Sequence, residues 1–273
     1  MRRATTAGSR HLFLVLASLL VLSPLVMMLI TALKSNQEYA ANAVGIPSNP
    51  TLENVKTVLD DPHLATWLTN SVIITAGSVA LAAVVSLLAA YPIARASGRW
   101  PRMLIPLLIL LIAVPPVVLV VPLFIVMDNL GLLNSKLGVI ITYSGLLTPL
   151  STYLLVGFIR GIPSALDEAA MIDGAGRGRV LLFVLLPLMR PALVTVGVVG
   201  SVYVWNEFLI ALLFLQSQGS QTIMVGIASL EGRYGINETL LAAWSLIASV
   251  PIVVAYLFGQ RFLVRGLVSG ALR

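Results

Sequence analysis

The chain has 273 residues, of which 58% are hydrophobic and only 10% are charged, and its mean hydropathy is +0.98. Soluble domains carry about a quarter charged residues, so this composition excludes an ordinary soluble globular protein and indicates a chain whose main solvent is lipid. The net charge of +6 would also suit a nucleic-acid-binding protein, but the basic residues stand in short segments that flank apolar runs, and the positive-inside rule explains that placement without a nucleic acid.

Uncharged, apolar runs follow one another along the chain. Each reaches the roughly 20 residues that a helix needs to cross about 30 Å of hydrocarbon. Backbone groups inside lipid must bond within their own segment, so these runs are expected to be helices. The sequence therefore predicts an all-α integral membrane protein with six transmembrane helices, at about residues 12–33, 69–94, 103–127, 137–159, 191–215 and 239–260.

The first run follows three arginines, as the apolar part of a secretory signal peptide does. It is about 22 residues long, which exceeds the usual length of about 7–15, and no small-x-small cleavage site comes directly after it. We therefore expect a retained transmembrane helix. An even number of spans then places both termini on the same side of the membrane.

The basic residues predict which side that is. Thirteen of the 17 lysines and arginines lie at the two termini and in residues 95–102 and 160–190. Because positive residues are retained on the cytoplasmic side, both termini and these two segments are predicted to face the cytoplasm. The segments that hold the other four are predicted to face outward, and they are residues 34–68, 128–136 and 216–238.

Prolines and tryptophans mark particular places in the runs. A proline removes a helix hydrogen bond and can kink the helix, and the pair Pro115-Pro116 is where we expect a kink that serves the function. Prolines are also ordinary in membrane helices, so the others carry a weaker expectation. Trp67 and Trp100 lie near the ends of runs and are expected to be interfacial anchors.

The segment between the fourth and fifth runs predicts two short helices. Ser164 can cap the first, with Asp167 at the third helical position as in a capping box, and good helix formers follow. Gly174 supplies a left-handed exit. A second, apolar helix runs from about 177 to 186 along the membrane surface and stops near Pro187.

Small side chains distinguish the first of these helices. Ala169, Ala170 and Gly174 fall on adjacent turns, so a partner surface could approach the backbone closely. Glu168 and Asp173 could make polar contacts at the edge of that surface. The other interpretation, from composition alone, is a well-capped surface helix that merely connects two spans.

One motif in this segment resembles the EAA loop of ATP-binding-cassette (ABC) importer permeases, whose pattern is EAA-x3-G-x9-I-x-L-P. The chain matches it with Glu168-Ala169-Ala170, Gly174 and Val184-Leu185-Leu186-Pro187, with valine where isoleucine is usual. In the family this loop, about residues 163–187 here, forms a coupling helix that docks into a cleft on a separate ATPase subunit. The resemblance implies a type I ABC importer fold and an ATPase-coupling role for Glu168, Ala169, Ala170, Asp173, Gly174 and Pro187.

Weaker resemblances extend over nearly the whole chain and point to the sugar-importer branch, in particular its maltose-type six-span subunit. They are Ala32-Leu33-Lys34, Thr69-Asn70-Ser71, Trp205-Asn206-Glu207-Phe208, Val264-Arg265-Gly266-Leu267 and Ser269-Gly270-Ala271. The resemblance implies a permease subunit of a bacterial cytoplasmic membrane. Its ABC transmembrane domain would be residues 67–262, between an N-terminal part, 1–66, and a cytoplasmic C-terminal tail, 263–273.

The resemblance also implies the partners. They are a second permease subunit, two ATPase subunits that use the ATP, an extracytoplasmic substrate-binding protein and the lipid bilayer, with no nucleic acid and no cofactor bound by this chain. The sequence leaves open which sugar is carried, which permease subunit holds the substrate contacts, and whether the two permease subunits are identical. It also leaves open whether residues 216–238 touch the binding protein or are an ordinary connection.

Polar residues inside the runs are candidates for the translocation pathway. A carboxylate at the centre of a bilayer costs about 2.5–3.5 kcal/mol on insertion scales, so Glu207 must face protein or water. In a continuous helix Tyr203, Asn206 and Glu207 share one face, and aromatic rings, amides and carboxylates suit the CH faces and hydroxyls of a sugar. Tyr143 and Ser144 in the fourth run could line the same path. Alternatively, these polar side chains hydrogen-bond to neighbouring helices.

Other functions stay open. An importer for glycerol phosphate, a polyol or a spermidine-like cation is the runner-up, although the apolar runs hold no basic residue to suit a phosphorylated solute. A membrane enzyme would need clustered acids, histidines, cysteines or a metal site, but the chain has no cysteine, and His11 and His63 lie outside the runs. No lysine follows a glycine, so this chain has no Walker A loop. A structural or sensory membrane protein is the remaining alternative.

Overall fold

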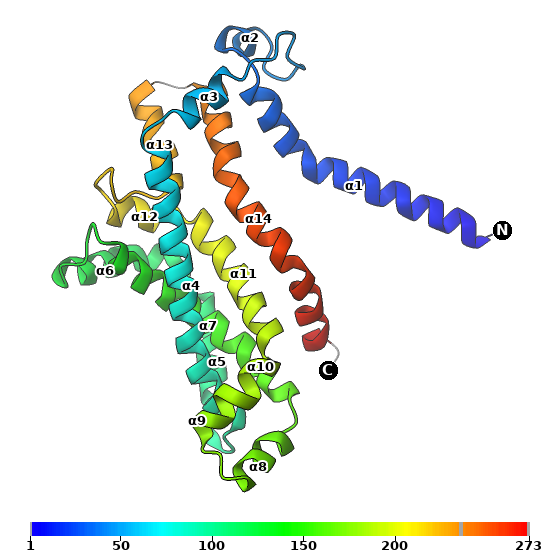
Figure 1. The fold of residues 1–273 in the computed structure, drawn as a ribbon, viewed down its shortest axis with the longest axis vertical. Coiled ribbons are helices and arrows are strands. Elements are labelled where there is room, and N and C mark those ends of the chain that lie inside the picture. The colour runs from blue at the N-terminus through cyan, green and yellow to red at the C-terminus, as the bar shows by residue number, and fades with distance from the viewer. Residues whose placement is uncertain (1, 235–236, 272–273) are drawn as a thin grey trace. The chain divides into compact units, whose positions relative to one another are not determined.

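The computed structural model describes residues 2–234 and 237–271, and every regular element within them is a helix (Figure 1). This confirms the prediction of an all-α chain. The chain divides into two compact units, Met1–Leu64 with Ile227–Val250 and Ala65–Gly226 with Pro251–Arg273.

In chain order the helices are α1 (Arg2–Ala32), α2 (Asn36–Ala41), α3 (Glu53–Leu59), α4 (Leu64–Arg95), α5 (Arg99–Ala113), α6 (Pro116–Asn129), α7 (Lys136–Gly161), α8 (Ala165–Ile172), α9 (Arg177–Arg179), η1 (Val180–Leu185), α10 (Leu186–Leu188), α11 (Arg190–Asn206), α12 (Leu209–Phe214), α13 (Ile223–Tyr234) and α14 (Glu238–Ala271).

Some of the predicted spans are long single helices and others are bent. Four described helices are long and apolar enough to cross a membrane, namely Phe13–Ala32 of α1, all of α4, all of α7 and Glu238–Gln260 of α14. Two further candidates are bent pairs, α5 with α6 at 93° and Arg177–Leu188 with α11 at 75°. If each bent pair is one span, the described residues give up to six, which is the predicted number. The second pair begins at Arg177, however, whereas the predicted fifth span was 191–215 and residue 177 was predicted to lie in the cytoplasm.

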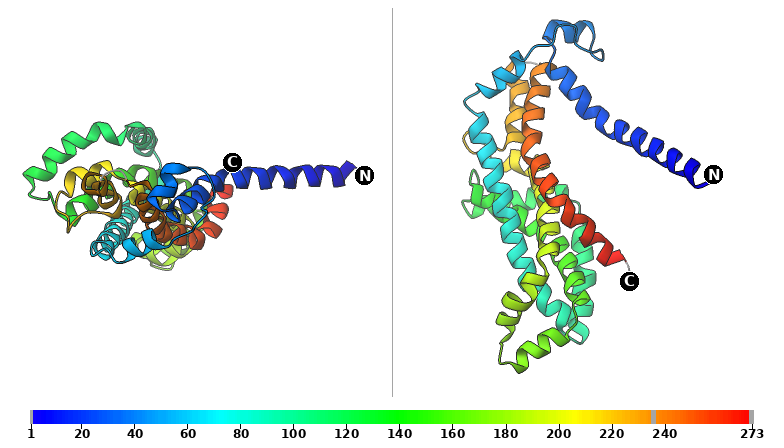
Figure 2. Two further views of the ribbon diagram at one scale, coloured as in Figure 1. Left: turned by 90° about the horizontal axis from the view of Figure 1, so that it is seen from above. Right: turned by 45° about the vertical axis from the view of Figure 1, so that its right-hand side comes forward.

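The break between α5 and α6 lies at the two consecutive prolines. Val114 is extended, with ψ 118°, and Pro115 is extended too, with ψ 127°. The ring of a proline pushes the residue before it out of the helical region, so two prolines in a row keep two residues extended. Pro116 is tolerated because it stands in the first turn of the new helix. A break is present at the predicted proline pair, and its role in the function stays a prediction. Figures 1 and 2 show α6 running at a steep angle to the long helix α4 of the same unit.

In the second unit, α7 contacts α5, α6, α11 and α12. Two buried apolar clusters follow it. The first joins α7 to α4 and α12 and includes Ile74, Tyr143, Leu147, Ile210 and Phe214. The second joins the other half of α7 to η1 and includes Leu155, Ile159, Val180, Leu185 and Met189. The elements that carry the candidate site residues are therefore fixed to one central helix.

In the first unit, buried polar bonds fold the segment that follows α1. Lys34 is fully buried, and its Nζ donates to Asn42 O (2.7 Å) and Ala43 O (3.1 Å). Asn54 Nδ2 donates to Ala32 O (2.9 Å) and Lys34 O (2.8 Å). A buried ammonium group needs acceptors of this kind. These bonds hold the segment after α1 folded against the C-terminal end of that helix.

The C-terminal part of the chain continues as helix. α14 extends to Ala271, over most of the segment that the sequence predicted as a tail. The side chains of residues 231–236 and 261–273, which include Arg233 and the Val264-Arg265-Gly266-Leu267 motif, lie outside the described residues.

Candidate functional site

The EAA segment forms a short helix with a left-handed exit. α8 covers Ala165–Ile172, and Gly174, two residues later, adopts φ +84°. Ala175 N donates to Ala170 O (2.9 Å), which closes the helix. A positive φ strains most residues that carry a Cβ, so the backbone here favours glycine. The predicted exit is confirmed.

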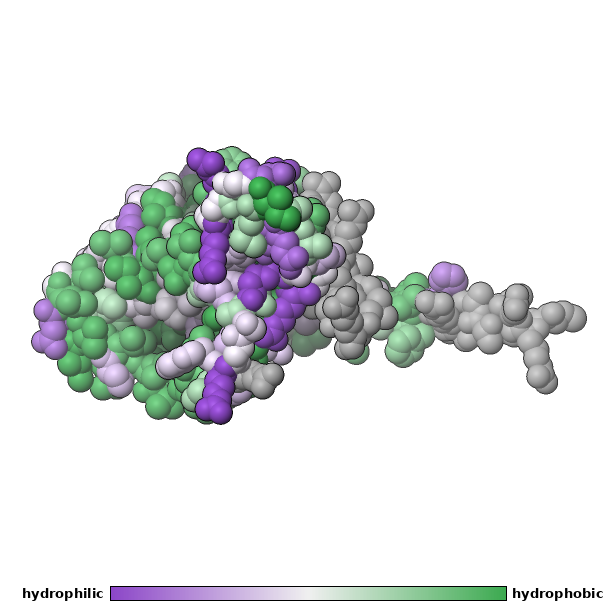
Figure 3. Space-filling view, turned by 90° about the horizontal axis from the view of Figure 1, so that it is seen from below, coloured by the Kyte–Doolittle hydropathy of each residue, from purple (hydrophilic) through white to green (hydrophobic). Residues whose placement is uncertain are grey.

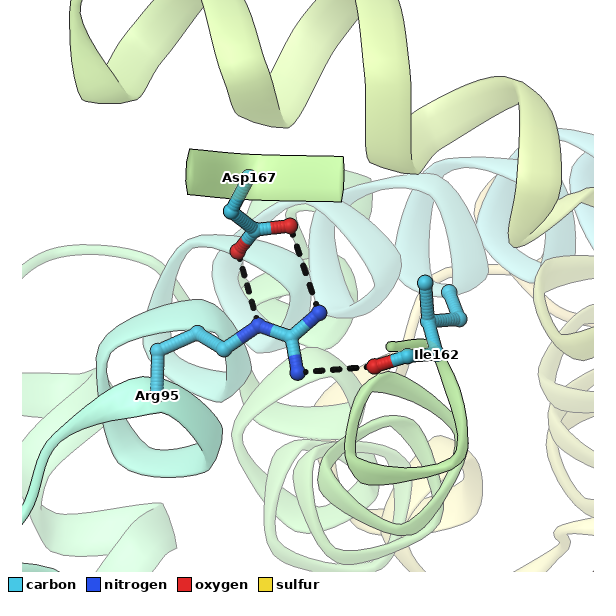
Figure 4. A network of polar contacts seen from close by, with 3 residues as sticks. All are labelled: Arg95, Ile162 and Asp167. Carbon is cyan, nitrogen blue, oxygen red and sulfur yellow. Dashed lines mark hydrogen bonds and ion pairs between the residues drawn. The ribbon is translucent and has the colours of Figure 1, made fainter. Parts of the chain in front are cut away.

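Asp167 does not form the predicted capping box. Ser164 is itself in helical conformation (φ −65°, ψ −21°) and makes no side-chain capping bond, so that prediction is wrong. Instead Arg95, the last residue of α4, binds the carboxylate: Nε donates to Asp167 Oδ2 (2.7 Å) and Nη2 donates to Oδ1 (3.3 Å) (Figure 4). Nη1 donates to Ile162 O (3.0 Å). Asp167 turns away from the helix end because a forked, charged donor satisfies a carboxylate better than one backbone N–H.

This ion pair is shielded from water. The side chain of Asp167 is 5% exposed and that of Arg95 is 18% exposed. Removing one partner of a buried pair leaves an uncompensated charge, which costs about 3–5 kcal/mol. The pair therefore fixes the start of α8 to the end of α4. Sequence reasoning missed it, because the only signal was an arginine that closes one apolar run and an acid in the next cytoplasmic segment.

The exposed side of α8 is charged in one part and apolar in another. Glu168 and Ala169 are exposed, whereas Ala170 is half-buried against the cluster of α7 and η1. The predicted face of small residues is thus divided, with Ala170 facing the protein's own core. Met171 (44% exposed) and Ile172 (86% exposed) extend apolar side chains outward. Figure 3 shows the end of the molecule that carries α8, where hydrophilic residues gather.

The edges of this surface are also exposed. Asp173 caps the C-terminal end of α8, and its backbone N–H donates to Ala169 O (3.1 Å). Both Asp173 and Gly174 are exposed. An added Cβ at Gly174 would meet nothing within 4 Å, so only its backbone conformation, and no internal contact, demands glycine.

The second half of the segment contains a wide helical turn. η1 is a π-helix, and it passes into α10, whose second residue is the exposed Pro187. A proline in a helix lacks an N–H, and its ring clashes with the carbonyl four residues earlier. The wider π turn before Pro187 relieves that clash. The predicted second helix is present and extends to Leu188, and its position along the membrane surface stays a prediction.

The predicted fifth span breaks at Glu207. α11 ends at Asn206, Glu207 is extended (φ −72°, ψ 129°), and α12 begins two residues later. The carboxylate turns onto the start of α12, where Oε1 accepts from Leu209 N (3.0 Å) and Oε2 accepts from Ile210 N (3.1 Å) and Ala211 N (3.4 Å). The first N–H groups of a helix have no partner within it, so the carboxylate of Glu207 satisfies them. The prediction of a continuous helix over 191–215 is therefore wrong.

Tyr143 completes the bonding of Glu207. Its hydroxyl donates to Glu207 Oε2, and its ring is fully buried. Ser144 is buried too, and its Oγ lies within hydrogen-bond distance of Ser78 O (3.0 Å) and Ile140 O (2.6 Å). In this structure Tyr143 and Ser144 hold helices together, which was the alternative interpretation of the sequence.

Tyr203 and Asn206 remain on α11. Tyr203 is half-buried and Asn206 is exposed, with Asn206 Nδ2 donating to Val202 O (2.8 Å). Because Glu207 has left the helix, the predicted face of three residues is wrong and reduces to these two.

Three side chains in the first turns of α4 bond the backbone of residues 218–223, which lead from α12 into the first residue of α13. The bonds join Trp67 Nε1 to Gln218 O (3.2 Å), Asn70 Nδ2 to Gly219 O (2.9 Å) and Gln221 O (2.8 Å), and Ser71 Oγ to Ile223 N (2.8 Å). Trp67 is 1% exposed, so the prediction of an interfacial anchor is wrong for it. Trp100 is 75% exposed, and its anchoring role stays a prediction.

Asn134 binds the backbone at the C-terminal end of α12. Its Oδ1 accepts from Gln216 N (2.6 Å) and Ser217 N (3.1 Å), and its own N–H donates to Phe214 O (2.8 Å). It adopts φ +55°, a conformation that asparagine tolerates better than most residues. α12 is therefore held at its start by Glu207 and at its end by Asn134.

Comparisons with known proteins agree with this architecture. The sequence model of the family described as "Binding-protein-dependent transport system inner membrane component" matches residues 82–268. The melibiose/raffinose/stachyose import permease protein MelC of Bacillus subtilis (strain 168) is 32% identical over 275 residues, covering 99% of each chain. The sulfoquinovosyl glycerol transport system permease protein SmoH of Agrobacterium fabrum is 35% identical over 270 residues, covering 98% of this chain and 95% of SmoH.

A solved structure shares the fold. It is a chain in the crystal structure of a bacterial ABC transporter involved in the import of the acidic polysaccharide alginate, with a TM-score of 0.79 at 21% identity, covering 94% of this chain and 96% of the other. The multi-span helical architecture, the EAA segment presented on α8 and the match over residues 82–268 agree: this chain belongs to the binding-protein-dependent transport system inner membrane component family.

Proposed function

We propose that this chain is the permease subunit of an ATP-driven, binding-protein-dependent importer and forms half of its translocation pathway for a sugar or oligosaccharide. It is a non-catalytic, multi-pass protein of the bacterial cytoplasmic membrane in this proposal. The observation that carries the proposal is α8, an exposed EAA helix that is fixed at its base by the buried Arg95–Asp167 pair.

α8 is the coupling helix in this proposal. Glu168 and Ala169 face outward beside the apolar side chains of Met171 and Ile172. Such a short helix fits a cleft on an ATPase subunit, where the apolar side chains fill the cleft and Glu168 makes a polar contact at its rim. Gly174 lets the chain leave the cleft directly after the helix.

The pathway lies beside the end of α11. Asn206 is exposed at the last residue of that helix, and Tyr203 is half-buried one turn earlier. An amide and an aromatic ring are what a sugar needs, since they bind hydroxyls and CH faces. Glu207 acts indirectly, because its bonds to α12 end α11 at Asn206 and so set where that amide lies.

The substrate class follows from the relatives and the residues together. The two relatives named above are named for the import of melibiose, raffinose and stachyose and for the transport of sulfoquinovosyl glycerol. The six apolar runs of this chain contain no lysine or arginine, so nothing in them would pair with an anionic group. A neutral oligosaccharide is therefore the proposed substrate, ahead of glycerol phosphate, a polyol or a polyamine.

The partners follow from the family and from the surfaces. The family is binding-protein-dependent, so an extracytoplasmic protein delivers the substrate. The chain has no Walker A loop, so two separate ATPase subunits supply the energy. A second permease subunit completes the pathway.

Coupling is tested in the assembled importer reconstituted into nanodiscs. Ile172→Asp places a charge where an apolar side chain enters the cleft, and Gly174→Trp adds both bulk and strain at the exit. Both variants should remain in the membrane while ATPase activity stimulated by the loaded binding protein falls about tenfold or more. Ser97→Asp, on the nearby exposed turn after α4, is the matched control and should keep full stimulation. Normal stimulation in Ile172→Asp and Gly174→Trp would remove α8 from the coupling mechanism.

The substrate class is tested by uptake into proteoliposomes. Radiolabelled raffinose, a sulfonated glycoside and glycerol phosphate are offered with the cognate binding protein, and uptake is normalised to assembled complex. The proposal expects uptake of the neutral oligosaccharide, reduced by Asn206→Leu. Uptake of glycerol phosphate alone would refute the sugar assignment.

A further inference from the structure

α4 is bonded at both ends to segments that the proposed function places on opposite sides of the membrane. Near its start, Trp67, Asn70 and Ser71 hold the backbone of residues 218–223. At its last residue, Arg95 holds α8. The helix has 32 residues, and at about 1.5 Å per residue its ends are about 48 Å apart. One continuous helix therefore joins the outer segment to the coupling helix.

The middle of α4 lies close against α7. A Cβ added at Gly77 would come within 2.9 Å of Ile140 Cδ1, so the two helices approach at the glycine. Further along, Ser86 Oγ donates to Thr148 O (3.3 Å). Small residues and interhelical hydrogen bonds are how membrane helices pack tightly. α7 thus supports α4 along its middle, and α4 stays helical through Pro92 to Arg95.

Arg95 uses its guanidinium in a way that lysine cannot reproduce. Three nitrogens of the group donate, two to the carboxylate of Asp167 and one to Ile162 O. Asp167 belongs to α8, whereas Ile162 caps the end of α7. The planar guanidinium group of Arg95 therefore connects both α8 and the end of α7 to the last residue of α4. A lysine would keep the charge but lose the fixed geometry.

We propose that Arg95 is a positioning residue for energy coupling. It makes α8 move together with α4, so that a displacement of residues 218–223 by the substrate-binding protein reaches the ATPase through α4. Arg95 contacts neither the substrate nor the nucleotide in this mechanism. The inference rests on the proposed function and adds to it the route by which the two sides of the membrane communicate.

The functional test uses the complete importer, with both permease subunits, the ATPase subunits and the binding protein, in nanodiscs. The measured quantity is the ATPase rate with loaded binding protein divided by the rate without it. Arg95→Lys loosens the inner attachment of α4, and Asn70→Ala loosens the outer one. Ser86→Ala is the matched control, because it removes a buried bond in the middle of the same helix.

Arg95→Lys and Asn70→Ala should each lower the stimulation ratio about threefold or more, and the double variant should lose no more than the larger single loss, because both act on one route. Ser86→Ala should keep the ratio of the unmodified importer. An unchanged ratio in Arg95→Lys, additive losses in the double variant, or an equal loss in Ser86→Ala would each overturn the inference. Stimulation of the unmodified importer is a separate result, and it tests the proposed function itself.

A distance measurement tests the attachment without any transport assay. The chain has no cysteine, so spin labels can be placed at Ser97→Cys and Ala165→Cys, just after α4 and at the start of α8, where both residues are exposed. With Arg95 present, the label-to-label distance should stay narrow and equal in the nucleotide-free and nucleotide-bound importer. It should broaden in Arg95→Lys and in Asp167→Asn. An equally narrow distribution in both variants would show that Arg95 does not hold α8.

Discussion

Replacing Glu207 tests whether this carboxylate is a helix cap or a pathway group. In the structure it accepts bonds from the N–H groups of Leu209, Ile210 and Ala211 and from the hydroxyl of Tyr143. Glu207→Ala removes all of these acceptors at once. The first N–H groups of α12 and the buried hydroxyl of Tyr143 then lose this acceptor.

The expected loss of stability follows from those bonds. Loss of a side-chain cap at a helix start costs about 0.5–2 kcal/mol, and an unsatisfied buried hydroxyl at Tyr143 costs about 1–3 kcal/mol. Glu207→Ala should therefore lower the free energy of unfolding by about 1.5–5 kcal/mol. Glu207→Gln keeps one acceptor oxygen and should lose about half as much.

The assay is chemical unfolding in mixed detergent micelles, followed by tryptophan fluorescence, since Trp205 lies two residues from the break. Asn206→Ala is the control, because this exposed side chain bonds only within its own helix, and its change should stay below about 0.5 kcal/mol. Tyr143→Phe combined with Glu207→Gln should cost less than the sum of the single changes, because the two side chains share one bond. If Glu207→Ala unfolds within about 0.5 kcal/mol of the unmodified chain, the capping argument is refuted.

Two further predictions concern orientation and packing. In whole cells, Gly219→Cys should react with an impermeant thiol reagent and Gly178→Cys should not, since the charge bias places residue 178 in the cytoplasm; labelling of Gly178→Cys from outside would reverse the topology. Gly226→Ala brings a Cβ to 2.2 Å from Trp67 Cε3 and should cost about 1–3 kcal/mol of stability through overpacking. Gly219→Ala, whose Cβ meets nothing within 4 Å, is its control, and equal stability of the two variants would contradict the packing argument.

The sequence predicted most of the helices because lipid constrains them strongly. A long apolar run must be helical, since its backbone groups have no other partner in a bilayer, and this holds for α4, α7 and α14. The sequence also predicted two local backbone conformations, a helix break and a left-handed helix exit. The consecutive prolines 115 and 116 break a helix through sterics alone, and Gly174 exits α8 in the left-handed conformation that few other residues adopt.

The sequence could not predict which polar partners meet across the fold. Arg95 and Asp167 are 72 residues apart, and Tyr143 and Glu207 are 64 apart, so neither pair follows a helical spacing. Asp167 was therefore assigned to a capping box with Ser164, because local spacing was the only information that the sequence offered about its partner. Glu207 was kept on a helical face for the same reason. Tertiary contacts determined the bonding partners of both carboxylates.

Breaks in membrane helices explain where these polar residues stand. A broken helix exposes N–H and C=O groups that have lost their helical partners, and where these groups are buried the protein must supply side chains to bond them. Glu207 and Asn134 do so at the two ends of α12, and Asn70 does so for the segment that follows it. A polar side chain that is fully engaged at a break has little capacity left for a passing solute. Exposed polar groups beside such breaks are the better pathway candidates, and at the end of α11 that group is Asn206.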